Sequence, residues 1–423
     1  MGDTPTVRRA RSLLQLTSLA SLVLAAACAG ATPAATGTTP TARREPELRE
    51  ARSVAPPEAP APRPPPSAPP AGRAVTIGAG GDAIFHLKVI RSAAEHAAEG
   101  GFSHVLGALR DVIGDDEVAI ANLETPLSER VPPETGDPPT LGAPSAVALA
   151  LAAAGIDVCS VANNHSYDQT AAGMTDTLRA LRDADVLAVG AADEEATAPG
   201  PVIVERDGVR VAFVAFTERV NRSPLAQGNY THVARYDDAL AAEVLSSARS
   251  RADVVVLSIH WSHDFIQTPR LAQRERARRL VDAGADLILG TGPHVLQEVE
   301  RLASPRGEAV VAYSLGNLVS NQALRYRTGR SIPLSMHPAV VLPTLRDGAW
   351  LRVRFSIEGE AVRVERLEAI PLWTFNNYLD VALHRQARLD VRVGPLRSMD
   401  DALRAERRPV IEAALGPAVT LLP

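Results

Sequence analysis

The sequence predicts an α/β fold, and two patterns in the later part of the chain support this prediction. From Ala74 onward, short runs rich in β-branched residues alternate with Ala-, Leu- and Arg-rich segments that have a helical period. Towards the C-terminus, two longer β-type runs flank Gly359, as in an antiparallel hairpin. With 46% hydrophobic residues among 423, the chain can bury a core of the size that such a fold needs.

The composition excludes several other classes of protein. The hydrophobic content and the 22% of charged residues exclude a chain that is disordered throughout, a coiled coil and a polytopic membrane protein. The formal net charge of −5 argues against non-specific binding of nucleic acid. Residues 1–73 hold 9 Arg and 5 acidic residues, whereas residues 74–423 hold 35 basic and 44 acidic residues. The later part is therefore acidic, and an anionic partner would need a local cationic site on it.

The first 28 residues have the features of an export signal. Arg8, Arg9 and Arg11 precede an apolar run from Leu13 to Ala27, which is too short to span a bilayer comfortably but suits a signal-peptide core. An alanine triplet then leads into Cys28, and this order resembles a bacterial lipobox. We expect cleavage before Cys28, lipidation of that cysteine, and a membrane-anchored lipoprotein that faces the periplasm or the cell surface. Ordinary cleavage after the alanine-rich stretch is the alternative.

The rest of the chain divides into three parts. Residues 29–73 are predicted to be a Pro/Ala-rich disordered tether, because residues 31–73 hold 12 of the 33 prolines and show no apolar period. A folded domain is expected over residues 74–385, followed by a helical tail over 386–423 whose best helix candidate runs from Met399 to Ala414. Within the domain, the second cysteine, Cys159, is predicted to be a buried thiol without a disulfide.

The alternating patterns predict the elements of this domain in order. The predicted strands are Val75–Ala79, Val118–Asn122, Asp157–Ala162, Val186–Val189, Val202–Val204, Val211–Phe216, Asp253–Ile259, Leu287–Leu289, Ala309–Tyr313, Trp350–Ile357 and Ala361–Glu368. The predicted helices are Lys88–Ala98, Ser103–Val112, Pro144–Ala153, Gln169–Asp183, Ala239–Ser250 and Pro269–Ala283. Asp168 is placed to cap the helix that begins at Gln169, and Pro269 stands at a first helical position. Gly284 ends the last of these helices before the next strand.

Polar residues follow the predicted strands, at the strand ends where ligands gather in α/β folds. In chain order, these ends carry Asp82, Glu124, Asn164 with His165, His260 and His294. Such a mixed set of carboxylate, amide and imidazole groups suits Zn, Mn or Fe rather than Ca. Two close ions could activate water and hold a phosphoryl group for attack. Each residue alone also has an ordinary explanation, for example a turn at Asp82 or a hydrogen-bonded core histidine at His260.

A second interpretation of the first strand is a dinucleotide-binding site. Gly78, Gly80 and Ala83 spell G-x-G-x-x-A directly after a β-type run. This pattern is short and common, Asp82 follows the strand, and nothing downstream resembles a second mononucleotide-binding half. The strand-end metal site is therefore the favoured interpretation.

Seven segments carry a recognisable pattern, in this order: Gly80-Gly81-Asp82, Asn122-Leu123-Glu124, Ala162–Asp168, His260-Trp261, Gly284-Ala285-Asp286, Pro293–Gln297 and Tyr313–Asn317. Together they resemble the motifs of the CapA family, the poly-γ-glutamate capsule biosynthesis proteins related to calcineurin-like metallophosphatases. The resemblance implies a four-layer αββα sandwich of two mixed β-sheets flanked by helices, with one or two divalent metal ions at the strand ends.

The resemblance also implies a role for each residue at a matching position. The implied metal ligands are Asp82 and His294 on a first metal, Glu124 as a bridging carboxylate, and Asn164 and His260 on a second metal. His165 corresponds to an outer-shell catalytic histidine that donates a proton or stabilises charge at the leaving oxygen. Asn163 and Asn317 correspond to groups that shape the site or bind substrate.

The chain departs from the family pattern at two positions. Gly292-Pro293-His294 stands where the family usually has His-Pro-His, and Ile84 stands where phosphatases have a histidine. The second metal site is therefore weakened, and one metal or none fits the sequence as well as two. His86 and His263 are the candidates to replace an absent imidazole, although both also suit ordinary polar surface positions.

These features predict an exported, lipid-anchored CapA-like protein that takes part in the synthesis, export or anchoring of an anionic envelope polymer such as poly-γ-glutamate. If it is an enzyme, we expect a hydrolase or transferase that uses Mn, Zn or Fe at a phosphoryl or acyl centre. The alternative is a non-catalytic envelope binding or anchoring module with the same fold, which the glycine at position 292 favours. No nucleic-acid partner is expected.

Overall fold

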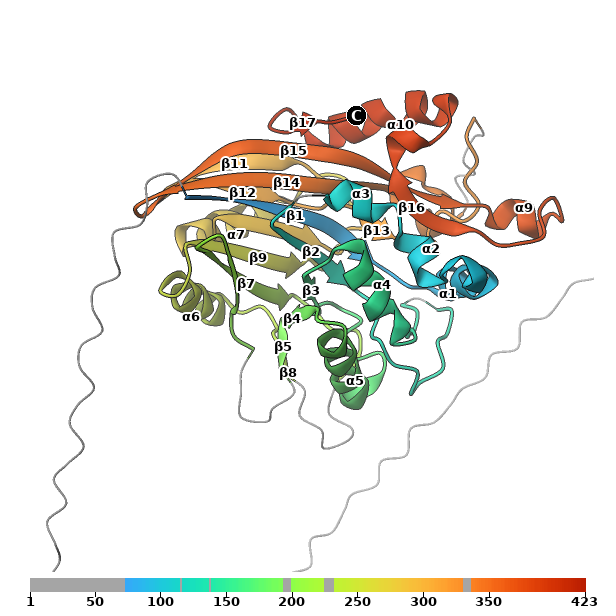
Figure 1. The fold of residues 1–423 in the computed structure, drawn as a ribbon, viewed down its shortest axis with the longest axis horizontal. Coiled ribbons are helices and arrows are strands. Elements are labelled where there is room, and N and C mark those ends of the chain that lie inside the picture. The colour runs from blue at the N-terminus through green and yellow to red at the C-terminus, as the bar shows by residue number, and fades with distance from the viewer. Residues whose placement is uncertain (1–72, 115, 137, 193–198, 224–231, 330–335) are drawn as a thin grey trace, which may run out of the picture. The chain divides into compact units, whose positions relative to one another are not determined.

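A computed structural model of the protein describes residues 73–114, 116–136, 138–192, 199–223, 232–329 and 336–423. In this part of the chain, a large mixed β-sheet is flanked by helices (Figure 1). The predicted signal peptide, Cys28 and the predicted tether up to residue 72 lie outside the described residues, whereas Arg73, the last residue of the predicted tether, begins the first strand. None of the helices within the described residues is long and apolar enough to cross a membrane.

The first half of the sheet is built around the N-terminal strand. Strands β1 (Arg73–Ala83), β2 (Val118–Leu123), β3 (Val158–Ser160) and β4 (Leu187–Val189) are parallel neighbours in this order. On its other side, β1 pairs antiparallel with β14 (Asp347–Glu358), and its last residues pair with the short β13 (Asn317–Val319). The carboxyl ends of β1, β2 and β3 therefore lie along one edge.

The second half contains another set of parallel strands. Strands β7 (Val209–Thr217), β9 (Val254–His260), β10 (Leu287–Thr291) and β12 (Gly307–Ala312) run parallel, with β6 (Val202–Arg206) antiparallel on β7 and β11 (Val299–Ser304) antiparallel on β12. All seven residues of β9 are buried, because layers cover both of its faces and its sequence is apolar almost throughout.

One long strand joins the two halves. Strand β15 (Ala361–Asn376) pairs antiparallel with β14 along its length, and Val362 pairs with Gly307 of β12. The two predicted mixed sheets are therefore joined by hydrogen bonds into one continuous sheet. This sheet folds over itself, so that its two sets of parallel strands pack against a shared core. That core includes Ile77, Ile120, Phe213 and Leu289, each of which is buried.

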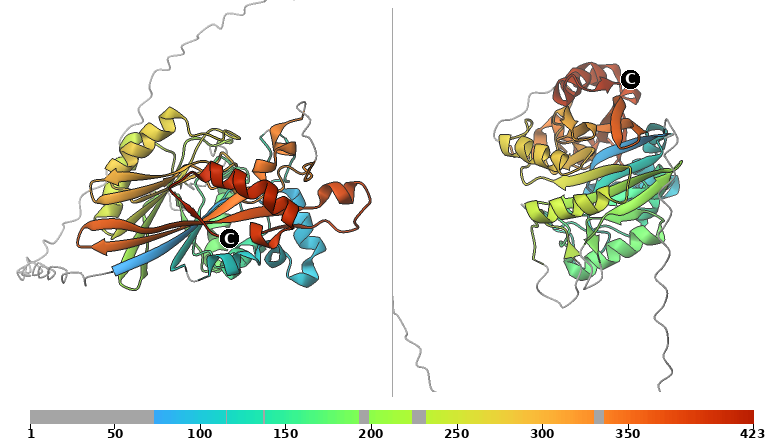
Figure 2. Two further views of the ribbon diagram at one scale, coloured as in Figure 1. Left: turned by 90° about the horizontal axis from the view of Figure 1, so that it is seen from above. Right: turned by 90° about the vertical axis from the view of Figure 1, so that its left-hand side faces the viewer.

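Helices cover the outer side of each half, which confirms the predicted four layers (Figures 1 and 2). The helices α1 (Leu87–Glu95), α2 (Phe102–Leu106), α3 (Leu109–Ile113), α4 (Ala146–Ala154) and α5 (Thr170–Asp183) cover β1, β2 and β3. The helices α6 (Asp238–Arg249) and α7 (Leu271–Asp282) cover β7, β9, β10 and β12. Cys159 is buried in the first of these outer cores as a free thiol, as predicted.

The remaining elements are short or lie towards the C-terminus. They are η1 (Ala97–Glu99), β5 (Ala191–Ala192), β8 (His232–Val233), α8 (Pro338–Val341), η2 (Pro343–Leu345), α9 (Tyr378–Ala382), β16 (Val391–Pro395), η3 (Leu396–Ser398), α10 (Asp401–Leu415) and β17 (Thr420–Leu421). The predicted tail helix is present as α10, which lies on the β14–β15 side, away from α5 (Figure 2). The segment after Arg385 contains more than this helix, since β16 and β17 both pair with β15.

Three local predictions were wrong. Asp168 does not cap α5, because its carboxylate instead accepts hydrogen bonds from Leu141 N–H and the His165 ring. Helix α7 begins after Pro269, at Leu271, where the Arg270 N–H donates to Oε1 of Gln273. The helix predicted over residues 103–112 is divided into α2 and α3 around Gly107.

Candidate functional site

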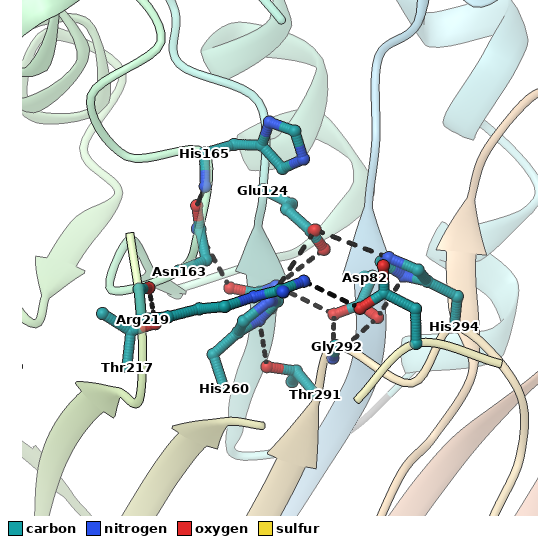
Figure 3. A network of polar contacts seen from close by, with 12 residues as sticks. Asp82, Glu124, Asn163, His165, Thr217, Arg219, His260, Thr291, Gly292 and His294 are labelled. Atoms are coloured by element: carbon teal, nitrogen blue, oxygen red, sulfur yellow. Dashed lines mark hydrogen bonds and ion pairs between the residues drawn. The ribbon is translucent and has the colours of Figure 1, made fainter. Parts of the chain in front are cut away.

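Four of the predicted ligands come together at the carboxyl ends of the parallel strands (Figure 3). Asp82 lies near the end of β1, Glu124 follows β2, His260 ends β9 and His294 follows β10. One ligand atom each from Asp82, Glu124 and His294 lies within 4.8 Å of the others, and Nε2 of His260 lies 3.8 Å from Oε1 of Glu124. The side chains of all four residues are almost fully buried.

Asp82 accepts hydrogen bonds from three directions. Its donors are Nδ2 of Asn122 at 2.8 Å, the backbone N–H of Gly292 at 3.1 Å, and Nδ1 of His294 at 3.0 Å. Burial alone would raise the pKa of Asp82, but the hydrogen bond and the charge of His294 outweigh burial and hold this pKa below its ordinary value. The carboxylate is therefore ionised, as a metal ligand must be.

Glu124 is the least satisfied carboxylate of the site. Among the described residues, its Oε1 is buried and accepts no hydrogen bond, although Nε2 of His294 lies 3.7 Å away. Burial and the nearby charge of Asp82 raise the pKa of Glu124 well above its ordinary value. A cation beside Glu124 would offset the cost of ionising this buried carboxyl group.

The two histidines have opposite charge states. Burial lowers the pKa of His260 to about 3, so this ring is neutral, and its Nδ1 lies 2.9 Å from the Thr291 hydroxyl, which leaves Nε2 on the Glu124 side. Burial would also lower the pKa of His294, but the carboxylates of Glu124 and Asp82 outweigh it and raise this pKa to about 9. His294 also has a φ of 60°, a left-handed conformation that costs a non-glycine residue energy and aims its ring at Asp82.

The loop after β3 holds the predicted catalytic histidine. Nδ1 of His165 lies 2.6 Å from Oδ2 of Asp168, and its backbone N–H donates to Oδ1 of Asn163. Asn163 also donates from Nδ2 to the backbone O of Leu123, which ties this loop to the end of β2. Asp168 thus fixes the ring of His165 and leaves its Nε2 available for chemistry.

A cavity of about 650 Å³ opens beside these groups. Glu124, Asn164, His165 and His294 line it, whereas Asp82 and His260 lie behind this lining. Its other polar lining residues are His86, Lys88, Glu134, Thr135, Thr140, Arg219, Asn221, Asp264, Asn321, Gln322 and His337. Such a cavity is large enough for a segment of a polymer or for a small substrate.

The residues present fit a divalent metal ion. Asp82, Glu124 and His294 are two carboxylates and an imidazole, the donor types that Zn, Mn and Fe accept. Oε1 of Glu124 and Oδ1 of Asn164 are both buried without a hydrogen-bond partner among the described residues, so two oxygen atoms have lone pairs that could coordinate a metal ion. Asp82, Glu124, Asn164, His260 and His294 would hold the ion.

Gly292 is required by the local geometry. Its φ is 98°, and a Cβ there would lie 2.6 Å from the backbone O of Trp261 and 3.0 Å from Nε2 of His260. A histidine at this position would collide with the neighbouring backbone, so the loop is built around glycine. At the other departure from the family pattern, Ile84 lines the cavity with an apolar side chain.

The other predicted residues differ in whether they line the cavity. His86 lines the cavity, and its Nδ1 accepts from the N–H of Asn321, whereas His263 is not among the lining residues. Asn163 and Asn317 do not line the cavity, and their amides bond within the protein, Asn317 through Nδ2 to Gln322 and Leu345. Both therefore shape the site, and substrate contact by either residue stays a prediction.

Three further residues lie at this site, and the sequence assigned none of them a role there. Asn122 donates to Asp82 and, at 3.4 Å, to Glu124. It stands two residues before Glu124 at the end of the same strand, and this spacing could have identified it. Lys88 and Arg219 come from a short helix and a loop, and no local pattern marks them.

The chain is similar in sequence to bacterial capsule synthesis proteins. A family described as "Bacterial capsule synthesis protein PGA_cap" matches residues 76–322. The PGA biosynthesis protein CapA of Bacillus subtilis (strain 168) is 32% identical over 207 residues, which are 45% of this chain and 53% of that protein. The capsule biosynthesis protein CapA of Bacillus anthracis is 33% identical over 186 residues, 43% of this chain and 44% of that protein. A probable polyglutamine synthesis accessory protein of Mycobacterium tuberculosis is 30% identical over 187 residues, 41% of this chain and 47% of that protein.

This chain spans about half the length of the curated relatives it matches. Among solved structures, a phosphatase from Mycoplasma pneumoniae has a TM-score of 0.41 and 12% identity, covering 71% of this chain and 94% of that one. The calcineurin-like phosphoesterase YfkN of Bacillus subtilis has a TM-score of 0.40 and 12% identity, covering 71% and 90%. Structural similarity of this extent supports no statement about chemistry.

Proposed function

Because the chain belongs to the bacterial capsule synthesis protein family, we propose that it takes part in the synthesis, export or anchoring of an anionic envelope polymer such as poly-γ-glutamate. The CapA relatives of two Bacillus species, whose names refer to PGA and capsule biosynthesis, support this proposal. The cavity also supports it, because Lys88 and Arg219 line its wall in a region that is acidic as a whole. These cations could hold an anionic chain beside the strand ends.

The proposed activity is that of a metal-dependent hydrolase or transferase. The observation that carries it concerns Oε1 of Glu124, a residue of the cavity wall. This oxygen is buried and accepts no hydrogen bond within the described residues, while Nε2 of His260 and Nε2 of His294 lie 3.8 and 3.7 Å from it. A divalent ion, when bound, would polarise a phosphoryl or acyl oxygen of the substrate.

Residues of the chain itself would supply the proton and orient the substrate. His165, held by Asp168 at 2.6 Å, would donate a proton to the leaving oxygen. Lys88 lies with Nζ 5.1 Å from the centre of the Tyr378 ring, and Arg219 is held by Asp264 at 3.0 Å, so both cations have supported positions for orienting an anion. His260, which is neutral and bonded to Thr291, would keep its Nε2 directed towards Glu124.

The proposal includes export and a lipid anchor. The apolar run up to Ala27 and the cysteine that follows support cleavage before Cys28 and attachment of lipid there, with residues 29–73 as the tether. Growth of the expressing bacteria with labelled fatty acid tests this. Label is expected on the wild-type protein in the membrane fraction, and label that persists on Cys28→Ala would contradict the anchor.

A second candidate function is a non-catalytic binding or anchoring module. The loop around Gly292 favours this second candidate. Any side chain at position 292 would collide with its neighbours, so the loop cannot hold the imidazole that the family pattern has there. In this case the cavity would hold a polymer segment without cleaving it.

One experiment separates the two candidates. The full chain, supplied with Mn²⁺ or Zn²⁺, is incubated with phosphodiesters and with poly-γ-glutamate, and both cleavage and polymer binding are measured. Cleavage that falls by a factor of about 10²–10⁴ in His165→Gln, but not in the exposed control His232→Gln, supports the enzyme. Polymer binding without any cleavage, equal in wild type and His165→Gln, would overturn the enzyme in favour of the binding module.

A further inference from the structure

A second group of potential metal ligands lies away from the strand-end cavity. His96 follows α1, His104 lies on α2, and Asp390 directly precedes β16. One ligand atom from each lies within 4.8 Å of the others. The three side chains are 12%, 21% and 17% exposed, so the group is accessible to an ion but largely shielded. None of these residues lines the strand-end cavity or belongs to the candidate site there.

The surroundings of His96 prepare its Nε2 as a ligand. Its Nδ1 lies 2.9 Å from Oε2 of Glu99, which holds the ring proton on Nδ1 and leaves the lone pair on Nε2. Within the described part of the chain, that Nε2 is buried and has no hydrogen-bond partner. Glu99 is in turn held by Arg388 at 2.7 Å. A carboxylate behind an imidazole is the usual support of a metal-binding histidine.

The other two ligands, His104 and Asp390, lie next to each other. The rings of His96 and His104 are stacked, with centroids 4.0 Å apart and planes 7° from parallel, so one ring has to turn out of the stack for both lone pairs to meet one ion. Nε2 of His104 lies 3.0 Å from Oδ1 of Asp390. The second oxygen of Asp390 pairs with Arg392, which leaves Oδ1 for a cation.

We propose that His96, His104 and Asp390 bind a divalent ion of the zinc class. Two imidazoles and one carboxylate oxygen are a preferred three-ligand set for Zn²⁺, with a fourth position left for water. Bonds of about 2.1 Å in a tetrahedral site place ligand atoms roughly 3.4 Å apart. The 3.0 Å between His104 and Asp390 is close to that separation, so the ion would replace the proton between these two atoms.

The ion would fasten the C-terminal part of the chain to the N-terminal helices. Helices α1 and α2 lie beside β16 (Figure 1). Without an ion, Val391 N–H donates to Oγ of Ser92, and Leu389 N–H donates to a carboxylate oxygen of Glu95. A metal at the cluster would join α1 and α2 to Asp390, which directly precedes β16 and lies 286 residues beyond His104. It would stabilise the folded chain by binding it in preference to the unfolded one.

The test is a zinc titration of the full chain, with bound metal counted by plasma mass spectrometry after dialysis. The variants are His96→Gln/His104→Gln, the exposed control His384→Gln, and Glu124→Gln, which perturbs the strand-end cluster. The double variant is expected to bind one equivalent fewer than wild type and His384→Gln. Glu124→Gln is expected to keep the zinc that the double variant loses. An equal number of equivalents in wild type and the double variant would overturn the proposal.

Two further measurements keep the test decisive if the double variant folds poorly. Asp390→Asn removes the charged ligand and Glu99→Gln removes only the support of His96, and each is expected to weaken zinc binding at this site by about tenfold or more. Co²⁺ bound here is expected to give the intense visible absorption of a tetrahedral site, which the double variant lacks. Undiminished affinity in both single variants, together with an unchanged cobalt spectrum, would contradict the proposal.

Discussion

The backbone N–H of Gly292 donates to the carboxylate of Asp82, with N and Oδ2 3.1 Å apart. This bond ties the loop after β10 to the end of β1, the two elements that carry the charged pair His294 and Asp82. The glycine is therefore a structural part of the candidate site, because its conformation and its N–H both serve the neighbouring carboxylate.

Replacing Gly292 is expected to destabilise the protein more than replacing a glycine with free space around it. Gly292→Ala forces a Cβ to within 2.6 Å of Trp261 O, whereas Gly359, at a φ of 62°, has no atom within 4 Å of a new Cβ. Gly359→Ala should cost about 1 kcal/mol of unfolding free energy, and Gly292→Ala about 2–4 kcal/mol. Urea unfolding of both variants checks this, and equal losses would contradict the packing argument. Gly292→His is expected to bind no more metal than wild type.

Asp168→Asn is expected to disturb the orientation of His165. The carboxylate of Asp168 serves both His165 Nδ1, at 2.6 Å, and Leu141 N–H, at 2.7 Å, and its side chain is fully buried. Oδ2 accepts both bonds, so an amide oxygen in its place can keep them only as weaker, uncharged bonds. The amide nitrogen then takes the place of Oδ1, which lies 3.4 Å from Nε of Arg222, so a donor faces a donor and we expect a loss of about 1–3 kcal/mol of unfolding free energy. The ¹⁵N spectrum of the His165 ring should change from a fixed Nδ1–H form to a mixture of tautomers. An unchanged ring spectrum would show that Asp168 does not position this histidine.

The pair Arg407–Asp347 is expected to hold α10 on β14. Arg407 donates to both oxygens of Asp347, at 3.1 and 2.5 Å, and both side chains are buried. Arg407→Met leaves a buried carboxylate unpaired and should cost about 3–5 kcal/mol of unfolding free energy. The control Arg404→Met, on the same helix but with a side chain that is 42% exposed, should cost about 1 kcal/mol or less.

The cost of Arg407→Met should also depend on pH. Burial raises the pKa of Asp347 to about 6 even beside Arg407, and loss of that cation raises it further. A carboxyl whose folded pKa is raised loses its stabilising proton as pH rises through that pKa. The variant therefore loses stability between pH 6 and 8 where wild type does not, so the cost should be larger at pH 8. Urea unfolding at both pH values measures this, and a cost that falls as pH rises would contradict it.

Cys159 is expected to resist alkylation in the folded protein. Burial raises the pKa of its thiol to about 12, so almost no thiolate exists at pH 8. Iodoacetamide followed by peptide mass spectrometry should find Cys159 unmodified in the native protein and modified in 8 M urea. Rapid modification without denaturant would show that the core around β3 opens.

Much of the fold could be predicted because its local patterns agree with its packing. The β9 segment is buried on both faces and its sequence is apolar almost throughout. The ends of the parallel strands similarly bring Asp82, Glu124, His260 and His294 together, since such strands finish along one edge.

The errors arose where tertiary contacts compete with local preference. Asp168 has the position of a helix cap, but its carboxylate bonds to His165 and Leu141 instead. Lys88 and Arg219 reach the cavity from separate segments, and His104 meets Asp390 across 286 residues, which no periodicity can reveal.

The central claim is that Glu124 and its neighbours hold a divalent ion, and metal stoichiometry tests it most directly. Manganese or zinc bound per chain should be lower by at least one equivalent in Glu124→Gln than in wild type and in Glu134→Gln, an exposed carboxylate on the same cavity. The His96 cluster is unchanged in all three proteins, so its zinc cancels in the comparison. Equal metal content in wild type, Glu134→Gln and Glu124→Gln would contradict the claim.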